Sequence, residues 1–157
     1  MTVKERDILR REIEIHAVDY AVAFIDNKVI DEINILKASI LAMHKALDKL
    51  RVRPEYILVD GNRFYPYRDI PYRCFVKGDG RFVSIAAASV LAKTYRDELM
   101  VDLHRKYDSY NWNKNKGYPT RYHRQMIVEK GITPFHRRSF RLTDRQLPID
   151  FNYAPKH

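Results

Sequence analysis

The sequence contains little cysteine and no long apolar run, and each shortage excludes a class of protein. A single cysteine, Cys74, among 157 residues rules out an internal disulfide and fits a reducing compartment. Because Cys74 lies in an apolar stretch, we interpret it as a buried, inert thiol. No stretch approaches the roughly 20 apolar residues that a membrane span needs, and the charged first residues contain no apolar signal core. We therefore expect a soluble, cytoplasmic protein without a membrane partner.

Several chemical signatures are also missing, whereas positive charge is abundant. The six histidines show no zinc-site spacing, and the sequence has neither a phosphate-cradling glycine loop nor a Gly-x-Ser-x-Gly nucleophile elbow. His123 and His136 stand beside arginines, which favours a surface or phosphate-contact role over catalysis. Lysine and arginine number 29 against 20 aspartates and glutamates, a net charge of +9. This surplus favours polyanionic partners, nucleic acid first.

The spacing of apolar residues predicts one α/β domain. Capping signals and three- and four-residue apolar steps predict helices over 2–15, 29–50, 84–107 and 120–130. Alternating or short apolar runs predict strands over 18–24, 56–59 and 74–76. A strand, a long helix and another strand in succession are typical of a crossover unit. We expect the domain to occupy residues 1–141 and a loosely held tail to follow at 142–157.

Two aspartates follow the two later strands. Asp60 ends the first run ahead of a Gly-Asn turn, and Asp79 follows the second through Lys77 and Gly78. Neighbouring strands would bring the carboxylates together, and a divalent cation would relieve their repulsion while gaining hard oxygen ligands. Asp-Gly and Gly-Asp are also common turn sequences, so the pattern alone leaves a metal site and two ordinary turn residues both open.

Two stretches near the C-terminus mix aromatic residues with cations. Residues 109–120 include Tyr118 and Lys116, and residues 134–140 include Arg137 and Arg138. Aromatic rings among cations suit base stacking combined with phosphate contact. A surface loop pinned by its own aromatic side chains agrees equally well with the first stretch, and both interpretations stay open.

Six literal motifs, in this order, resemble the bacterial ribonuclease HII family from about residue 2 to 141. They are Asp-Glu-Ile-Asn-Ile-Leu at 31–36, Leu-Val-Asp-Gly-Asn at 58–62, Val-Lys-Gly-Asp at 76–79, Ser-Ile-Ala-Ala-Ala-Ser-Val-Leu-Ala-Lys at 84–93, Asn-Lys-Gly-Tyr-Pro-Thr at 115–120 and His-Arg-Arg-Ser-Phe at 136–140. The resemblance implies a ribonuclease H-like α/β fold, with a mixed sheet flanked by helices. It also implies hydrolysis of the RNA strand of RNA–DNA hybrids, and nicking 5′ of ribonucleotides embedded in duplex DNA.

The resemblance also assigns residues to the site. Asp60 and Asp79 match two of the family's four metal-binding carboxylates, so a catalytic site that uses Mg²⁺ or Mn²⁺ replaces the turn interpretation. Tyr118 matches the tyrosine that packs at the junction between ribonucleotide and deoxyribonucleotide. We expect the other contacts to RNA–DNA hybrid or ribonucleotide-containing duplex to come from basic side chains: Lys77, Lys116, Arg137 and Arg138.

The chain departs from the family pattern at its start. The family opens with a strand bearing Asp-Glu and a Gly-Arg-Gly segment, and neither occurs here. In the family's sheet order of 3-2-1-4-5, these would be strands 1 and 2. We therefore expect an N-terminally truncated member, with impaired activity and self-association through exposed strand edges. Two alternatives stay open: a basic, non-catalytic nucleic-acid-binding remnant, and one half of a two-chain enzyme.

Overall fold

The computed structural model describes residues 2–139, and these fall into two compact units. Among the described residues, one unit comprises 2–25 and Leu36–Tyr95, and the other comprises Asp26–Ile35 and 96–139. The tail predicted at 142–157 lies outside the described residues. No helix within 2–139 is long and apolar enough to cross a membrane.

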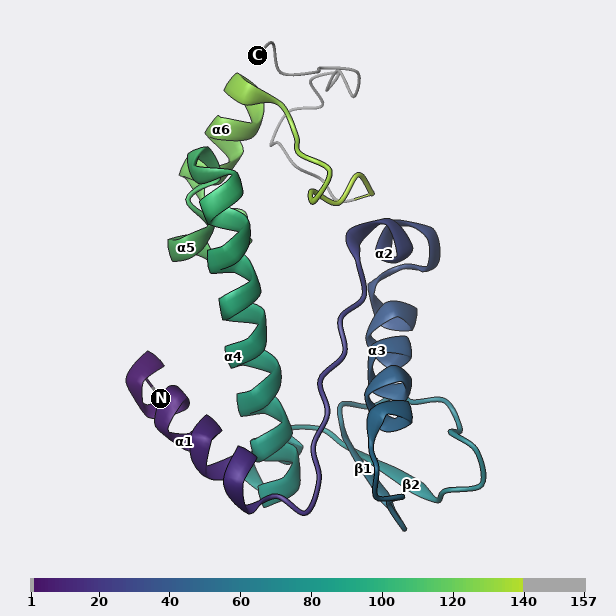
Figure 1. Cartoon of the computed structure of the whole chain (residues 1–157). Coiled ribbons are helices and arrows are strands. Elements are labelled where there is room, and N and C mark those ends of the chain that lie inside the picture. The colour runs from purple at the N-terminus through teal and green to yellow at the C-terminus, as the bar shows by residue number, and fades with distance from the viewer. Residues whose placement is uncertain (1, 140–157) are drawn as a thin grey trace. The chain divides into compact units, whose positions relative to one another are not determined.

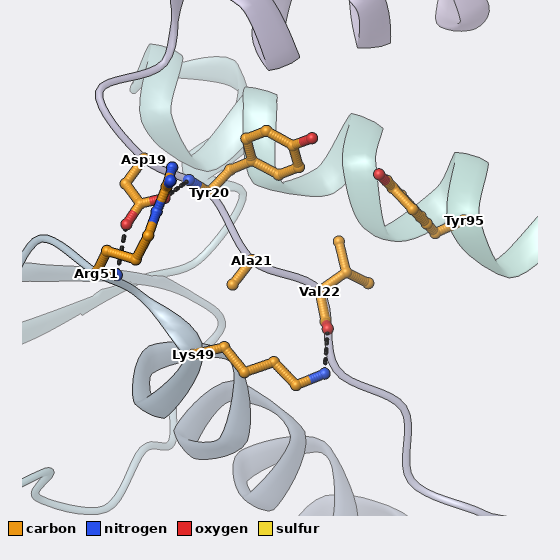
Figure 2. Close-up of a pocket in the computed structure, with 7 residues that line it drawn as sticks. All are labelled: Asp19, Tyr20, Ala21, Val22, Lys49, Arg51 and Tyr95. Atoms are coloured by element: carbon orange, nitrogen blue, oxygen red, sulfur yellow. Dashed lines mark hydrogen bonds and ion pairs between the residues drawn. The ribbon is translucent and has the colours of Figure 1, made fainter.

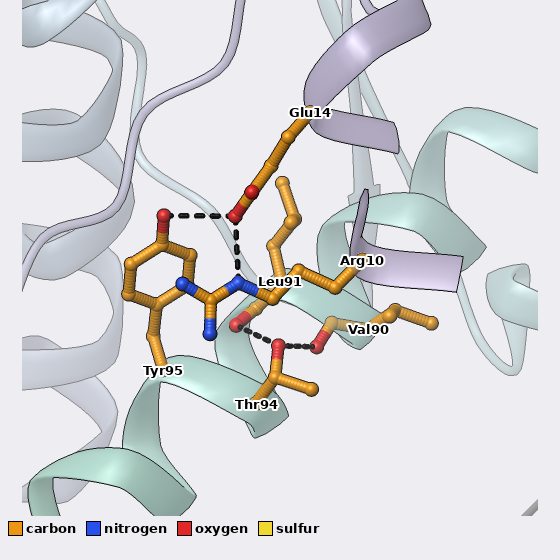
Figure 3. A network of polar contacts seen from close by, with 6 residues as sticks. All are labelled: Arg10, Glu14, Val90, Leu91, Thr94 and Tyr95. Carbon is orange, nitrogen blue, oxygen red and sulfur yellow. Dashed lines mark hydrogen bonds and ion pairs between the residues drawn. The ribbon is translucent and has the colours of Figure 1, made fainter. Parts of the chain in front are cut away.

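The first unit begins with helix α1 (Val3–His16), which starts at the predicted capping box. The Thr2 hydroxyl accepts from the Glu5 N–H while the Glu5 carboxylate accepts from the Thr2 N–H, so two end donors are satisfied. The other end of α1 is joined to helix α4 (Val83–Lys106). Figure 3 shows the contact: Arg10 and Tyr95 both donate to Glu14 Oε1, at 2.6 and 2.9 Å, and the Arg10 guanidinium stacks over the Tyr95 ring.

The strand predicted over 18–24 is wrong, because residues 17–26 form no strand. The backbone there is bonded by side chains and turns instead of by a neighbouring strand. Lys49 Nζ donates to the Val22 carbonyl at 2.8 Å, and Asp19 accepts from the N–H groups of Arg51 and Val52. A two-residue apolar alternation needs a partner strand to become a strand, and no described segment supplies one here.

The single helix predicted over 29–50 is two helices, α2 (Asn27–Ile33) and α3 (Ile35–Lys49). Asn34 separates them with φ of 70° and ψ of 166°, an extended conformation with positive φ that ends α2. Helix α2 starts at Asp26, whose carboxylate accepts from the Val29 N–H. The apolar residues predicted for this helix still lie on one side of α3, and that side faces the core of the first unit.

Two parallel strands, β1 (Ile57–Asp60) and β2 (Tyr72–Phe75), form the described sheet, with Ile57 opposite Tyr72 and Asp60 opposite Phe75. Both strands overlap the predicted ranges of 56–59 and 74–76, and β2 starts two residues earlier than predicted. Helix α3 lies beside this sheet (Figure 1), and Ile40 of α3 is buried in one cluster with Ile57 and Val59 of β1. The connecting loop adds three more buried side chains to this cluster, namely Phe64, Tyr67 and Ile70.

The second unit has a separate core around short helices. After α4 come the 3₁₀ turn η2 (Asp108–Tyr110), helix α5 (Trp112–Asn115) and helix α6 (Arg121–Lys130). The predicted loop at 109–120 therefore contains two short helical segments. Helix α6 is confirmed, with Thr120 as its N-cap and Gly131 at its end. Tyr110, Trp112, Met126 and Ile127 form the buried cluster, against which the last turns of α4 pack through Met100 and Leu103.

Candidate metal centre and nucleic-acid contacts

Asp60 is the last residue of β1, where the chain leaves the core. Buried Ile57 and Val59 alternate with less buried neighbours along β1, so the strand is anchored and delivers an exposed carboxylate at its carboxyl end. Asp60 Oδ1 accepts a hydrogen bond from the Gly78 N–H at 2.9 Å. This bond holds the carboxylate against the turn that follows β2.

Asp79 lies in that turn, the 3₁₀ turn η1 (Gly78–Gly80), beside Lys77. Lys77 has φ of 55° and an exposed side chain. Gly78 is buried, and a Cβ atom there would lie 2.6 Å from Ile85 Cδ1, so the turn packs closely against the start of α4. Asp79 is exposed, and within 2–139 its carboxylate has no hydrogen-bond or ion-pair partner. Both aspartates therefore present oxygen atoms near one end of the two strands.

The donor chemistry of these carboxylates fits a hard divalent cation, although they supply only part of a coordination shell. Mg²⁺ and Mn²⁺ bind through carboxylate oxygens and retained waters. Within the part of the chain that the structure describes, no group of three or more histidine, cysteine, aspartate or glutamate side chains could hold a metal. A metal ion at Asp60 and Asp79 would therefore have at most these two carboxylates as ligands among the described residues.

Tyr118 and Lys116 lie in the second unit, on a tight turn between α5 and α6. Buried Asn115 fixes this turn: its amide donates to the Tyr110 carbonyl at 2.7 Å and accepts from the Gly117 N–H at 2.9 Å. Lys116 and Gly117 both have positive φ, of 50° and 78°. Tyr118 is 63% exposed, with the Arg96 guanidinium 5.1 Å from its ring centroid. Its ring is accessible to a base or sugar.

Arg137 and Arg138 also lie in the second unit, on a segment held by α2. Asp31 accepts from the N–H groups of Arg138 (2.8 Å) and Ser139 (3.1 Å), and Asn27, one turn earlier, donates to the His136 carbonyl at 2.9 Å. Burial raises the pKa of Asp31, but the hydrogen bonds from Ser139 and Arg138 outweigh it and leave this pKa below its ordinary value. Arg138 is exposed and Arg137 partly buried.

The surface role predicted for His123 and His136 is wrong, because both are only 6% exposed. Their Nε2 atoms lie 3.0 Å apart, and Trp112 Nε1 donates to His123 Nε2 at 3.3 Å. Burial lowers the pKa of both, and the neighbouring His123 helps to lower that of His136 to about 4. The helical spacing of His123 with buried Met126 and Ile127 could have indicated that this histidine faces the core.

The seven predicted site residues therefore form two groups, one in each unit. Asp60, Lys77 and Asp79 belong to the first, and Lys116, Tyr118, Arg137 and Arg138 belong to the second. For residues 109–120, the interpretation as a segment pinned by its own aromatic side chains is confirmed, and nucleic-acid stacking stays a prediction. Tyr110 and Trp112 are buried and pin the segment, whereas Tyr118 is exposed.

A pocket of about 420 Å³ lies elsewhere in the first unit and includes none of these seven residues. Figure 2 shows Asp19, Lys49, Arg51 and Tyr95 among its lining side chains. Its cations are already engaged, since Arg51 pairs with Asp19 and Lys49 donates to the Val22 carbonyl. The backbone N–H groups of Val52 and Arg51 lower the pKa of Asp19. We interpret this pocket as the space left where the 17–26 segment is held against α3 by these contacts.

Comparison with known proteins identifies close relatives. A family model described as Ribonuclease HII matches residues 1–143. Proteins named Ribonuclease HII from Christiangramia forsetii and Bacteroides thetaiotaomicron are each 56% identical to the chain, over 151 and 152 residues. Each match covers 96% of this chain and 76% of the relative.

A solved structure shares the fold. The crystal structure of the ribonuclease H2 from Pyrococcus horikoshii OT3 matches with a TM-score of 0.74 and 24% identity. The match covers 90% of this chain and 74% of that chain. The ribonuclease H-like α/β fold is thereby confirmed, with a two-stranded parallel sheet as its described β portion.

Proposed function

The chain belongs to the ribonuclease HII family, whose members are ribonuclease H-type endonucleases acting on RNA–DNA hybrids, and from this premise we propose which reaction its residues serve. The reaction is hydrolysis of the RNA strand of hybrids, and nicking of duplex DNA 5′ of embedded ribonucleotides. The observation that carries it is the hydrogen bond from Gly78 N–H to Asp60 Oδ1. This bond places one carboxylate beside the turn that bears Asp79.

Asp60 and Asp79 are proposed to hold Mg²⁺ or Mn²⁺. A bound ion supplies a Lewis acid that activates the attacking water and stabilises the leaving oxygen. The chain's own part is to orient the carboxylates: β1 delivers Asp60, the Gly78 N–H fixes its Oδ1, and η1 presents Asp79. Because two carboxylates leave much of a coordination shell to water and substrate, we expect weak activity from this 157-residue chain.

The nucleic acid is proposed to meet one aromatic ring and four cations. Tyr118 offers an exposed ring for the ribonucleotide–deoxyribonucleotide junction. Lys77, Lys116, Arg137 and Arg138 would contact phosphates, which position the duplex without reading its sequence. The net charge of +9 supports this electrostatic contribution.

Cleavage of a DNA duplex containing one ribonucleotide, in Mn²⁺, tests the proposal. Asp60→Asn should lower the rate by at least about 100-fold, since loss of even a hydrogen-bond partner of a metal ligand costs about 10- to 100-fold. Asp102→Asn is the matched control: it removes the same charge from a surface ion pair on α4 and should leave the rate unchanged. Equal rates for wild type and Asp60→Asn would overturn the assignment.

A non-catalytic binding protein is the second candidate, favoured by the incomplete carboxylate set. This candidate function predicts no cleavage. It also predicts that the affinity for duplex is the same with and without divalent metal, and with and without a ribonucleotide in the duplex. Retained binding together with measurable, Asp60-dependent nicking would exclude this candidate.

Self-association is proposed as a consequence of the short sheet. Within 2–139, β1 and β2 pair only with each other, so each has an edge without a strand partner. Light scattering at increasing concentration should show a rising mean mass. A constant monomer mass across that range would contradict the proposal.

A further inference from the structure

The buried histidines of the second unit form a directional hydrogen-bond chain that the proposed chemistry does not use. The Thr133 N–H donates to His136 Nδ1 at 3.0 Å, so this nitrogen must be unprotonated and the proton of His136 lies on Nε2. His136 Nε2–H then faces His123 Nε2, which also receives the indole N–H of Trp112. His123 Nε2 is therefore an acceptor.

The remaining proton of His123 is thereby placed on Nδ1, which lies 3.1 Å from the Tyr118 carbonyl. One tautomer of each neutral ring gives each step of the series from Thr133 through His136 and His123 to Tyr118 a donor and an acceptor, and His123 Nε2 shares its single lone pair between His136 and Trp112. The Tyr118 backbone is held by other bonds as well, from Thr120 N–H to its carbonyl and from its own N–H to the Asn115 carbonyl, both at 2.8 Å. The chain of histidines adds a link from Tyr118 to the segment that carries Arg137.

We propose that His123 and His136 are positioning residues for ribonucleotide recognition, holding the exposed Tyr118 ring in a fixed relation to the Arg137–Arg138 segment. The proposal rests on the proposed function, in which Tyr118 packs at the ribonucleotide junction. It deepens that function by assigning specificity to two side chains that never touch the nucleic acid themselves.

The arrangement requires both rings to be neutral. A second proton on His136 would create an Nδ1–H that points at the Thr133 N–H, so two donors would face each other. A second proton on His123 would create an Nε2–H that faces the donors of His136 and Trp112. Within residues 2–139, the groups shown in contact with the pair include no carboxylate: they are Tyr110 from η2, Trp112 from α5, Thr133 and the Tyr118 carbonyl. Arg124 and Arg137 adjoin the pair along the sequence. Burial lowers the pKa of both rings and so favours the neutral pair, although the hydrogen bond to the Tyr118 carbonyl acts in the opposite direction on the pKa of His123.

Two substitutions of His123 separate its two hydrogen bonds. His123→Gln places an amide oxygen near the Nε2 position, so it keeps an acceptor for His136 and Trp112 but loses the donor to Tyr118. His123→Asn places an amide N–H near the Nδ1 position, so it keeps the donor to Tyr118 but loses the acceptor. Both variants are uncharged at every pH, which makes them a matched pair.

The readout is the affinity for a duplex with one ribonucleotide divided by that for the same duplex in all-DNA form, measured by fluorescence anisotropy in EDTA. His123→Gln should lower this ratio about fivefold to tenfold, the effect of one hydrogen bond, with all-DNA affinity unchanged. His123→Asn should keep the ratio. An equal fall in both affinities for both variants, in step with their melting temperatures, would show a packing role only and overturn the proposal.

A second measurement needs no nucleic acid. Trp112 is the single tryptophan and bonds to His123, and a protonated imidazole quenches an adjacent indole. Its fluorescence should fall on acidification with a midpoint below 6.5, and the fall should shrink in His123→Gln. A midpoint at 6.5 would overturn the histidine chain itself. If the midpoint is low but the wild-type chain binds both duplexes equally, the histidine chain exists but the chain does not recognise ribonucleotides. That result would overturn both the proposed recognition and the positioning role of the histidines.

Discussion

Individual backbone groups decide how closely the turn that bears Asp79 approaches the core. Gly78 carries the N–H that holds Asp60, and it is buried between Phe75 and Ile85. Ordinary van der Waals contact would need its neighbour to be at least about 3.4 Å away, but a Cβ here would meet Ile85 Cδ1 at 2.6 Å. Glycine at this position saves space, since a Cβ would force the buried Ile85 side chain to move, and its backbone angles do not require glycine.

Gly78→Ala should therefore destabilise the chain by about 1–3 kcal/mol, the usual cost of overfilling a packed site. It should also weaken any metal-dependent activity, because the shifted turn moves the N–H away from Asp60. Urea unfolding measures the first effect and Mn²⁺-dependent nicking the second. Gly80→Ala, where a Cβ meets nothing within 4 Å, is the control and should change neither. Unchanged stability of Gly78→Ala would contradict this packing.

Helices are joined in this chain by a few polar contacts as well as by apolar stripes. Helix α1 buries no residue fully, yet it is tied to α4 where Arg10, Glu14 and Tyr95 meet. The hydrogen bond from Arg10 lowers the pKa of Glu14, while burial and the bond to Glu14 raise that of Tyr95. Helix α1 therefore depends on this contact more than on its apolar side.

Tyr95→Phe should lower the free energy of unfolding by about 1 kcal/mol, since it removes one hydrogen bond to a charged, partly buried acceptor and keeps the ring beneath Arg10. Urea unfolding followed by circular dichroism measures the change. Tyr122→Phe on α6, with a residue that is 48% exposed, is the matched control and should be neutral. Equal effects of the two substitutions would mean that the hydrogen bond from Tyr95 to Glu14 contributes nothing to the free energy of unfolding.

At the scale of the whole molecule, acid affects histidines and carboxylates in different pH ranges. The folded chain resists protonation of His123 and His136, whose pKa values lie below 6.5. The unfolded chain binds these protons first, so stability falls as the pH drops below 6.5. Carboxylates with lowered pKa, such as Glu14 and Asp31, stabilise the fold above their ordinary pKa and lose this contribution at lower pH.

We expect the free energy of unfolding to decline as the pH falls from 6.5 to about 4. His136 should contribute at most about 3 kcal/mol to this decline, because a pKa difference of one corresponds to about 1.4 kcal/mol. Urea unfolding at stepped pH, followed by Trp112 fluorescence, measures this. His136→Gln should flatten the decline in that range and keep the steeper loss below it. A wild-type profile that is flat from pH 6.5 to 4.5 would refute the buried neutral pair.

The sequence by itself determined the elements whose signals are local. The capping box at Thr2, the Thr120 cap and Gly131 end of α6, and the short apolar run of β1 each predict their element correctly. The literal motifs determined the family as well. Caps and apolar periodicity act within a few residues, so they need no knowledge of the rest of the chain.

Only the tertiary structure decided which segments find partners. The alternating run at 18–24 forms no strand because no described strand pairs with it, and the helix at 29–50 breaks at Asn34. His123 and His136 are buried because η2, α5 and the 131–136 segment close around them. Strand pairing and burial depend on contacts between residues far apart along the chain, so the local sequence around each residue does not predict them.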